Sequence, residues 1–367
     1  MHALHRSVAE RINSWVGSHH GTTIVIAVIG LMLATGMASA VLMYQSPKAD
    51  APISHVTTTP TPSTTPAPVY YSPLSGVKVP DQASTQQVVT GVMIENSPDA
   101  RPQSGLKNAD VVFEAIAEGG ITRFMALYQP SKPQLIGPVR SLRLYDIDWL
   151  APFQAAIAHV GGSQQALSTI RDGLHRDLDQ FFNGGSYWRV SDRYAPHNVY
   201  TSFAKLDALN QRKGYSTSDL APWPRQDGAP AKTVTAKTID VTISGPLYNS
   251  HYVYDPTTNT YARYQAGAPH LDREGGQITP TVVIVMDVNE QTVLQDGYRE
   301  QITTTGSGNA HIFENGTVTT ATWTKADAGS QIKFTDAAGK EVALNRGQTW
   351  ITAVPANRRG RVVWQTK

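Results

Sequence analysis

Cysteine is absent from all 367 residues of this chain. Its absence excludes a disulfide scaffold, a thiolate nucleophile and a thiolate metal site. It also excludes attachment to a membrane through a lipid-modified N-terminal cysteine. The fold must therefore be held by packing and hydrogen bonding alone, and the length is sufficient for two domains with substantial cores.

An excess of charge of one sign is also absent, because 31 Lys and Arg residues stand against 29 Asp and Glu residues. No basic run interleaved with aromatic residues occurs, so we predict no nucleic-acid partner. Neither a His-Glu-x-x-His motif nor a calcium-loop pattern is present. The one local pair of candidate metal ligands is His270 and Asp272, with His251 and His311 farther away in the sequence. We therefore expect no metal site and no cofactor.

A long uncharged apolar run is the first positive feature. Residues 23–44 contain no charged side chain, and about 20 helical residues cover the roughly 30 Å hydrocarbon core of a bilayer. We predict a single transmembrane helix there, with residues 1–22 as a cytoplasmic leader. The orientation follows from Arg6 and Arg11 before the run, against only Lys48 close behind it.

A cleavable signal peptide is the alternative for this segment. Ala38, Ser39 and Ala40 have the small-x-small form of a cleavage site, and the apolar run before them has the length of a signal sequence. Both interpretations place the remaining chain outside the cytoplasm.

Residues 45–73 are dominated by Pro, Thr, Ser and Ala. Such a segment buries too little apolar surface to offset the entropy lost on ordering. We predict a disordered, extended stalk between the membrane and the folded part.

The remaining sequence predicts an α+β protein with two domains. Residues 74–215 alternate apolar strand patterns with helices near 164–172 and 202–212, which indicates a mixed α/β domain. Residues 216–232 are rich in Pro and Gly and form the predicted linker. Residues 233–367 contain short strand patterns separated by turn residues, which favours a mostly antiparallel β domain. The strands expected there are 238–244, 251–254, 261–264, 282–288, 311–313, 318–324, 332–335 and 349–354.

The clearest local pattern is a β-hairpin formed by residues 111–118 and 121–128, joined by Gly119 and Gly120. With Glu118 opposite Ile121, regular pairing places Ile116 opposite Arg123. Arg123 would then lie diagonally from both Glu114 and Glu118 on one sheet face. This cluster is either a structural ion network or a site in which a carboxylate acts as acid or base.

A second group of polar residues surrounds a predicted strand that ends at His159. It comprises Arg140, Arg143, His159, Gly161, Gly162, Ser163, Arg193, His197 and Asn198. Ligands of α/β sheets bind at the carboxyl ends of strands, and the arginines can grip a carboxylate or phosphate through two hydrogen bonds. We predict that this group binds an anionic ligand, with backbone N–H groups at the helix start near Ser163 contributing.

Each of these residues also has a structural explanation. The arginines can bind backbone carbonyls, His197 can pack against Tyr200, and the two glycines can form a tight turn. Ser163 fits a helix N-cap better than a nucleophile, because the glycine that follows the serine in a nucleophile elbow is missing. In the second domain, Trp323, Trp350 and Trp364 are either core residues or an aromatic platform for sugars.

Five motifs in the first predicted domain resemble those of the YerB-like lipoprotein family. They lie at residues 100–106, 118–124, 136–141, 159–163 and 195–202, and residues 270–272, 306–308 and 347–350 resemble the C-terminal domain of the same family. The resemblance covers about residues 74–365 and implies a two-domain protein at the bacterial cell surface. It implies no particular reaction. This chain departs from the lipoprotein members because it lacks the lipidated cysteine.

Two classes of function follow. In the first, the protein is a membrane-anchored module that binds a cell-wall polymer or an envelope protein. In the second, it is an enzyme acting on an envelope polymer, with Glu114 or Glu118 and His159 or His197 as acid and base. Convergence of Glu118, Arg140, His159 and His197 around a cleft favours the enzyme, whereas dispersed or fully paired side chains favour the binding module.

Overall fold

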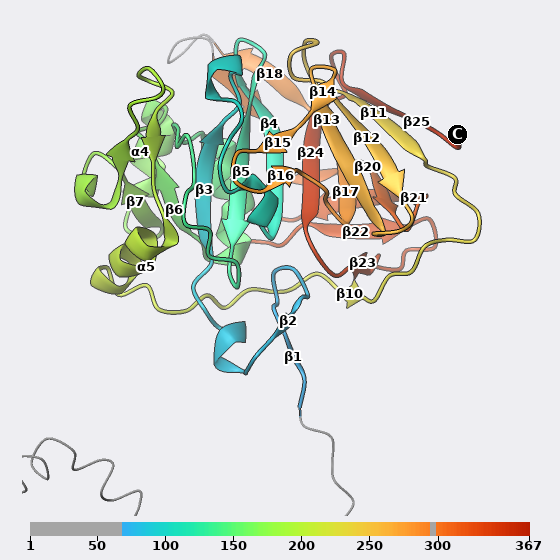
Figure 1. Ribbon diagram of the computed structural model, residues 1–367, viewed down its shortest axis with the longest axis horizontal. Helices are drawn as coiled ribbons and strands as arrows, with labels where there is room; N and C mark the ends of the chain where they lie inside the picture. Colours follow the sequence, from blue (N-terminus) through green and yellow to red (C-terminus); the bar gives the residue numbers. More distant parts are fainter. Residues whose placement is uncertain (1–67, 294–298) are drawn as a thin grey trace, which may run out of the picture. The chain divides into compact units, whose positions relative to one another are not determined.

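The computed structural model describes residues 68–293 and 299–367 (Figure 1). These residues fall within one compact unit that runs from Ala67 to Lys367. The predicted transmembrane helix at 23–44 and most of the predicted stalk lie outside the described residues. Among the residues that are described, no helix is long and apolar enough to cross a membrane.

The described part of the chain is mostly β with few helices. A central sheet has twelve strands, ten of which follow one path. In spatial order these are β22 (Lys333–Asp336), β21 (Thr317–Lys325), β20 (Gly306–Glu314), β17 (Val282–Val288), β24 (Thr349–Pro355), β4 (Val111–Glu118), β5 (Ile121–Tyr128), β3 (Thr90–Glu95), β6 (Ala156–His159) and β7 (Arg176–Asp179). The hairpin of β18 (Glu290–Val293) and β19 (Arg299–Ile302) joins this sheet where Arg299 pairs with Glu118.

Strands from both predicted domains share this sheet. β24 pairs in parallel with β4, with Trp350 opposite Val112, and also in parallel with β17. The division into domains at 215 and 233 stays a prediction, whereas the hydrogen bonding of the central sheet is continuous across it. The predicted linker carries β10 (Arg225–Gln226), which pairs in parallel with β23 (Leu344–Asn345).

A second sheet is antiparallel throughout and belongs to the C-terminal half. Its order is β14 (Ala268–Pro269), β13 (Thr260–Gln265), β12 (Ser250–Asp255), β11 (Thr238–Thr242) and β25 (Arg361–Gln365). Short strand pairs complete the β structure: β1 (Tyr70–Tyr71) with β2 (Lys78–Val79), β8 (Trp188–Arg189) with β9 (Val199–Tyr200), and β15 (Leu271–Asp272) with β16 (Gly276–Gln277). β1 lies inside the last residues of the predicted stalk.

Three α-helices occur in the described residues: α3 (Leu144–Leu150), α4 (Gln164–Ile170) and α5 (Phe203–Arg212). The start of each helix is stabilised by a side chain that accepts a hydrogen bond from a backbone N–H group. Asp146 accepts from Arg143 N at the start of α3, Ser163 caps α4 and Ser202 caps α5. Single 3₁₀ turns lie at η1 (Ala83–Thr85), η2 (Pro98–Ala100), η3 (Leu106–Asn108), η4 (Ala151–Phe153) and η5 (Gly184–Ser186).

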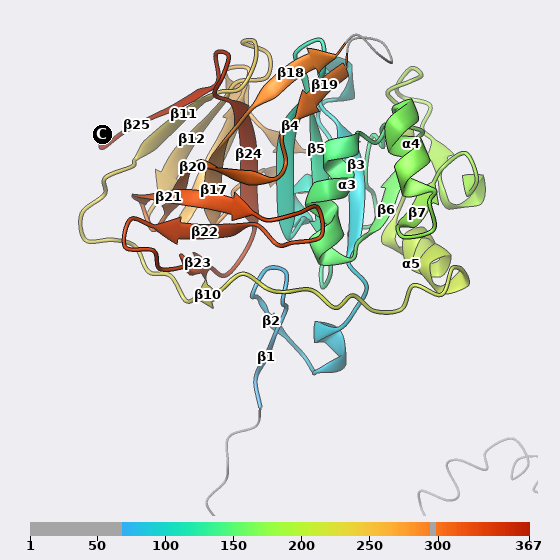
Figure 2. The same ribbon diagram turned by 180° about the vertical axis from the view of Figure 1, so that it is seen from behind.

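The central sheet is buried on both faces. Residues alternate along β4, so that Phe113 and Ala115 join one core cluster and Val112 and Ile116 the other. The first cluster includes apolar residues of α3 and α4, and Figure 2 shows α3 lying along this face. The second includes apolar residues of α5 and of the five-stranded sheet, which cover the opposite face (Figure 1).

The predicted pairing of the β4–β5 hairpin is wrong by one residue beyond its turn. Glu118 pairs with Ile121 as expected, but Arg123 pairs with Ala115, because a β-bulge lies between Ile116 and Glu118. A one-residue bulge reverses the face that the following side chain occupies. Glu114 and Glu118 therefore lie on opposite faces of the sheet, and the predicted cluster of two carboxylates around Arg123 does not form.

Glu114 instead makes a fully buried ion pair with Arg263 of β13, between the two sheets. Arg263 Nη2 lies 2.8 Å from Glu114 Oε2, and both side chains are 0% exposed. Trp350 Nε1 donates to the same oxygen at 3.2 Å, and Thr122 donates to Glu114 Oε1 at 3.2 Å. The guanidinium also donates to the hydroxyl of Tyr252 and lies 4.5 Å from the ring centre of Trp350.

The Arg263 guanidinium continues into a chain of buried hydrogen bonds. It donates to His270 Nδ1, so His270 Nε2 carries the proton given to Gln103 Oε1 at 3.1 Å. Burial, assisted by the charge of Arg263, holds the pKa of His270 well below its ordinary value. Gln103 Nε2 then donates to the backbone carbonyl of Glu95 at 3.0 Å. The network thus connects β4 to β13 and both to the end of β3.

Replacing Arg263 by Met should lower the free energy of unfolding by about 3–5 kcal/mol, because Glu114 would be left as an unpaired buried charge. The double variant Glu114→Leu, Arg263→Met should be less destabilised than this single variant. Urea denaturation measures both, with Arg361→Ala, an exposed arginine of β25, as control. A loss below about 1 kcal/mol for Arg263→Met would contradict the importance of the pair.

Candidate functional site

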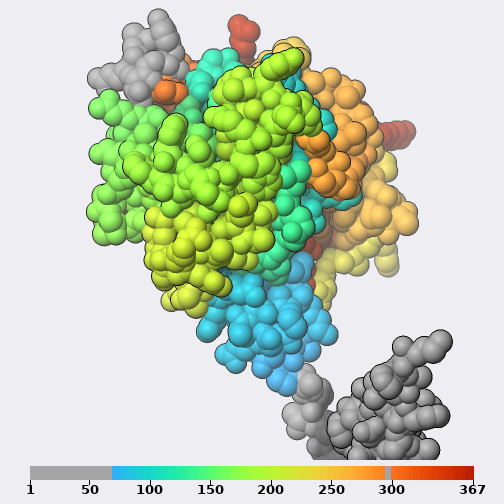
Figure 3. Space-filling model, turned by 60° about the vertical axis from the view of Figure 1, so that its left-hand side comes forward, coloured from blue at the N-terminus to red at the C-terminus, as the bar shows by residue number. Residues whose placement is uncertain are grey.

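Three parallel strands end side by side with a titratable residue at each carboxyl end. β3 ends at Glu95, β6 at His159 and β7 at Asp179, and β6 pairs in parallel with both of its neighbours. All three side chains are buried. The segment that carries α4, β7 and α5 forms much of the left-hand face of the molecule, at the edge of the sheet where β6 and β7 lie (Figure 1 and Figure 3). The carboxyl ends of these strands are thus where the sequence predicts a ligand site.

Arg140 lies in a segment that enters the sheet between β3 and the residues after β6. Glu95 N donates to Pro138 O at 2.9 Å, and Arg140 N donates to Met93 O at 2.8 Å. On the other side of the segment, Val160 N donates to Arg140 O at 3.0 Å. The backbone at Arg140 is therefore fixed by hydrogen bonds to both strands, next to the carboxyl end of β3.

The Glu95 carboxylate gathers Arg140, His197 and Ser97 around it. His197 Nδ1 lies 2.9 Å from Glu95 Oε1, and Ser97 Oγ donates to the same oxygen at 2.8 Å. Arg140 Nε lies 3.4 Å from Glu95 Oε2, but neither atom has a hydrogen-bond partner in the described part of the chain. We call Glu95, Arg140 and His197 the Glu95 cluster.

Exposure divides the Glu95 cluster into an inner carboxylate and two outer side chains, a guanidinium and an imidazole. The Glu95 side chain is 4% exposed, whereas Arg140 is 24% and His197 is 22% exposed. His197 Nε2 faces outward, 4.0 Å from the exposed carboxylate of Asp99. One buried carboxylate thus holds two partly exposed side chains.

His159 is fully buried and bound on both ring nitrogens. Nδ1 lies 2.8 Å from Gly161 O, and Nε2 lies 3.1 Å from Asp177 Oδ1. Burial raises the pKa of Asp177, but the hydrogen bond and charge of His159 outweigh that effect, so its pKa lies below the ordinary value. With 0% exposure and both nitrogens occupied, His159 has a structural role at the strand end.

The glycines and the serine after His159 also have structural roles. Gly161 has φ +61°, and a Cβ at Gly162 would lie 3.0 Å from the carbonyl oxygen of Leu142. Ser163 Oγ accepts from Ala166 N at 3.3 Å as the N-cap of α4. This helix has only seven residues, so the anion site predicted at its start is not supported by a long helix dipole.

Arg193 and Asn198 hold the loop that precedes β9. Arg193 Nη2 donates to Pro102 O at 2.6 Å. Asn198 accepts from Arg189 Nη1 at 2.6 Å and donates to two backbone carbonyls, those of Val190 and Arg193. Asn198 therefore holds the loop that carries His197, whereas Arg193 ties this loop to Pro102 and keeps one buried nitrogen, Nη1, without a hydrogen-bond partner among the described residues.

Glu118 is surrounded by three arginines on the face that carries α3. Arg123 Nη2 lies 3.2 Å from Glu118 Oε1, Arg143 Nε donates to Oε2 at 2.9 Å, and Arg299 Nη1 lies 3.6 Å from Oε2. Burial raises the pKa of Glu118, but the charges of Arg123 and Arg143 outweigh it and lower the pKa to about 2. Such a carboxylate stays ionised and is a poor acid or base at neutral pH. Arg143, a predicted ligand-binding residue, is occupied by this carboxylate.

The predicted site residues are thus divided among separate carboxylates rather than gathered at one centre. Glu114 pairs with Arg263, Glu118 with Arg143, and His159 with Asp177, while only Arg140 and His197 share Glu95. Of the two candidate histidines, only His197 combines a carboxylate partner with access to solvent.

The three tryptophans and the candidate metal ligands of the second predicted domain lie in the core or pack against it. Trp323 and Trp350 are buried, and Trp364 packs against the rings of His311 and Phe313. In the candidate metal pair, both side chains are buried. His270 binds Arg263, and Asp272 accepts backbone N–H groups of Lys107, Glu274 and Gly275. No group of three or more His, Asp or Glu residues suited to a metal ion occurs within the described ranges.

Sequence reasoning missed Glu95, although it ends an apolar strand pattern just before a turn. A carboxylate at the end of a buried strand is the signal that could have identified it. It also missed Glu290 and Glu300, which line a pocket of about 300 Å³ together with Arg358. Those two carboxylates lie in a segment with no motif around them.

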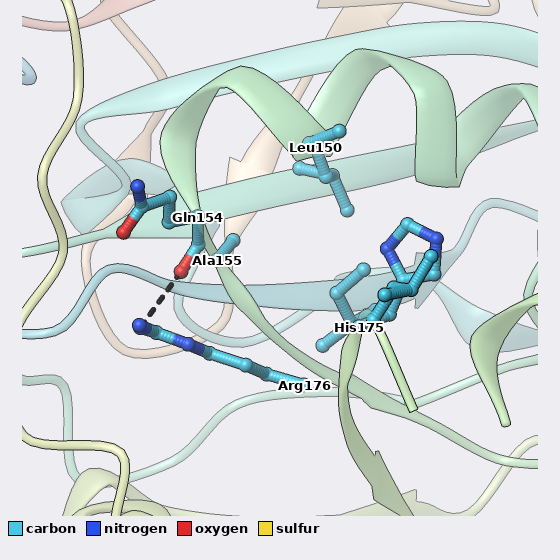
Figure 4. Close-up of a pocket in the computed structure, with 8 residues that line it drawn as sticks. Leu150, Gln154, Ala155, His175 and Arg176 are labelled. Carbon is cyan, nitrogen blue, oxygen red and sulfur yellow. Dashed lines mark hydrogen bonds between the residues drawn. The ribbon is translucent and has the colours of Figure 1, made fainter. Parts of the chain in front are cut away.

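Another pocket of about 300 Å³ lies at the opposite end of β6 and β7, against the end of α3 (Figure 4). Leu150 and Ala155 supply apolar lining, and Arg176 Nη1 donates to Gln154 O at 3.0 Å. The Arg176 guanidinium also donates to Thr217 O. The Nη1 group of Arg176 is thus occupied by backbone carbonyls, and this pocket lies away from the Glu95 cluster.

Comparison with known proteins gives consistent results. The models of a family described as protein of unknown function, DUF3048, match residues 74–216 (N-terminal domain) and 239–351 (C-terminal domain). A protein named "Putative lipoprotein YerB" from Bacillus subtilis (strain 168) is 32% identical over 290 residues, 77% of this chain and 86% of that protein. The crystal structure of YerB protein from Bacillus subtilis has a TM-score of 0.72 at 29% identity, covering 80% of this chain and 99% of that chain.

Replacing Glu118 by Gln should lower the free energy of unfolding by about 1–2 kcal/mol at neutral pH, after allowance for solvent screening. Because the pKa of Glu118 is lowered from 4.5 to about 2, this stabilisation is complete above the ordinary value and disappears as pH falls through about 2. Urea denaturation at several pH values should show the difference from wild type shrinking with acidity. Asp227→Asn, at an exposed surface pair, is the control, and a difference independent of pH would contradict the assignment.

Proposed function

Because the chain belongs to the DUF3048 family, we propose that it is a membrane-anchored extracytoplasmic protein that binds an anionic cell-envelope ligand through the Glu95 cluster. The ligand class is a wall-peptide carboxylate, a sugar acid or a phosphate. The compartment is supported by the name of the Bacillus relative, which describes a lipoprotein. The chain contains no cysteine, so its attachment would use the apolar segment 23–44 in place of a lipid.

The observation that carries the proposed ligand is the incomplete pairing of Arg140. Its Nε lies 3.4 Å from Glu95 without a hydrogen bond, and no other partner of its guanidinium is found in the described part of the chain. The two Nη groups can therefore donate to two oxygens of an incoming anion. Glu95 orients the guanidinium from the inner side, and the hydrogen-bonded segment at Pro138 fixes its backbone.

The pairing of the remaining carboxylates favours a binding module. Glu114 and Glu118 each have an arginine partner, and His159 has no access to solvent. An anion bound by Arg140 would approach His197 as well, and Nε2 of His197 can donate a second hydrogen bond when the imidazole is protonated. Arg140 and His197 would then recognise the ligand by its negative charge and by the directions of its hydrogen bonds.

An envelope-polymer hydrolase or transferase is the second candidate, and one observation favours it. Glu95 accepts at His197 Nδ1 and leaves Nε2 outward, which is the orientation of a general base held by a carboxylate. In this alternative the acid–base pair is Glu95 with His197, in place of the pairs expected from the sequence.

Replacing Arg140 by Ala should weaken binding of purified anionic wall fragments by at least about tenfold, because the bidentate charge-assisted contact is lost. The free energy of unfolding should change by less than about 1 kcal/mol, as for a partly exposed side chain. Co-sedimentation and denaturation measure the two effects. Arg361→Ala removes an equal charge at an exposed position of β25 and should bind like wild type. Unchanged binding by Arg140→Ala would overturn the proposal.

Replacing His197 by Gln separates the two candidates. For a binding module, the variant should retain measurable binding of wall fragments, since Arg140 remains. For an enzyme, it should abolish the release of soluble fragments from the polymer, detected by mass spectrometry, because no other accessible base replaces Nε2. Release of fragments by wild type but not by the variant would favour the enzyme over the module.

A further inference from the structure

The pocket that contains Glu290 and Glu300 is built by segments from distant parts of the chain. It lies at the tip of the β4–β5 hairpin, where the end of β11, the β18–β19 hairpin and the loop before β25 meet. Ser244 Oγ donates to Gly120 O at 2.6 Å and joins two of these segments. The volume of about 300 Å³ is at the lower end for small-molecule sites.

One guanidinium holds both carboxylates of this pocket. Arg358 Nη1 lies 3.0 Å from Glu290 Oε1, and Arg358 Nη2 lies 3.2 Å from Glu300 Oε2. Thr292 donates to both oxygens of Glu300, at 3.1 and 3.0 Å. The pocket therefore contains two carboxylates on one cation, and Glu300 is the better satisfied of the two.

Glu290 is the polar group with unused bonding capacity. Its side chain is 1% exposed, and its Oε1 accepts no hydrogen bond from any described residue although Arg358 is near. Asn357 fixes the backbone of Glu290 through two hydrogen bonds, of 3.0 and 2.8 Å. Burial, followed by the charge of Glu300 and opposed by Arg358, raises the pKa of Glu290 to about 7. A buried carboxylate held in this way is stabilised by any further cationic donor.

The rim of the pocket offers the complementary charge. Arg359 lines the pocket and is exposed, and no ion pair or hydrogen bond of its side chain is found among the described residues. Its guanidinium is free to bind a carboxylate through two hydrogen bonds. Ile116, Ile243 and Pro355 supply apolar surface in the same pocket. An inner anion, an outer cation and an apolar wall thus lie within one small volume.

We propose that this pocket binds a free α-amino acid with an apolar side chain. The ammonium group donates to Glu290 beside Glu300, and the carboxylate binds Arg359. The aliphatic side chain lies against Ile116, Ile243 and Pro355. Arg358 carries one positive charge and can neutralise only one of the two carboxylates. The positive charge of the ligand's ammonium group neutralises the other. This site is separate from the Glu95 cluster, and its occupancy does not depend on the function proposed there.

The charge balance gives a distinctive pH dependence. An ammonium group pairs with the ionised form of Glu290, whose neighbours in the pocket are Glu300, Arg358 and Arg359. With a pKa of about 7, Glu290 is mostly protonated below that pH, so binding should strengthen as pH rises through it and should release a proton near neutrality.

The test is calorimetric titration of the full-length protein in detergent with L-leucine and L-alanine. Leucine should bind at millimolar or lower concentration and more tightly at pH 8 than at pH 6. The measured heat near neutrality should depend on the ionisation enthalpy of the buffer. Arg359→Ala should weaken leucine binding by at least about tenfold, with Arg361→Ala as the control that keeps wild-type affinity.

A second variant keeps the result interpretable if one substitution affects folding. Glu290→Gln preserves the shape of the side chain and should remove both the affinity and the pH dependence. Thermal denaturation shows whether each variant is folded. Failure of wild type to bind either amino acid, or full affinity in folded Glu290→Gln and Arg359→Ala, would overturn the proposal. Neither result would affect binding of wall fragments by Arg140, so the two proposals fail separately.

Discussion

The buried ion pair between Glu114 and Arg263 is the interaction on which the arrangement of the two sheets depends. Two charges removed from water are tolerated only when each finds a partner and further hydrogen bonds. Here the guanidinium contributes hydrogen bonds to Glu114, Tyr252 and Gln265 as well as to His270. Because Glu114 lies in β4 and Arg263 in β13, the pair requires the five-stranded sheet to lie in one position over the central sheet.

The same network reaches the candidate ligand site. From Arg263 it passes through His270 and Gln103 to the backbone of Glu95, and Gln103 also donates to Asn96 Oδ1 at 3.1 Å. The carboxyl end of β3 is thereby fixed from the core side. Arg140 and His197 meet Glu95 from the solvent side. A rigid inner carboxylate with partly exposed outer nitrogen groups is an arrangement that preorganises recognition.

Local patterns in the sequence predicted many elements but not their pairing. The apolar strand at 282–288 corresponds to β17 and the helix at 202–212 to α5, because periodicity and a Ser N-cap are local signals. The motif resemblance to YerB-like proteins is confirmed by the family match and the similar crystal structure.

The parallel pairing of β24 with β4 joins residues more than two hundred positions apart, and no local pattern encodes it. The β-bulge near Ala117 also has no local sequence signal, and it alone places Glu114 and Glu118 on opposite faces of the sheet. For the site, the structure places Arg140 and His197 on one carboxylate, Glu95, which the sequence patterns did not single out.

The parallel junction of β24 and β4 also constrains the order in which the fold can be completed. β4 gains its hairpin partner β5 within a few residues, but its other edge pairs with residues 349–352. During synthesis, this edge of β4 stays without its partner until residues 349–352 have been made. Exposed strand edges of this kind favour wrong pairing while they last. Completion of the central sheet is therefore tied to the synthesis of one late strand, β24.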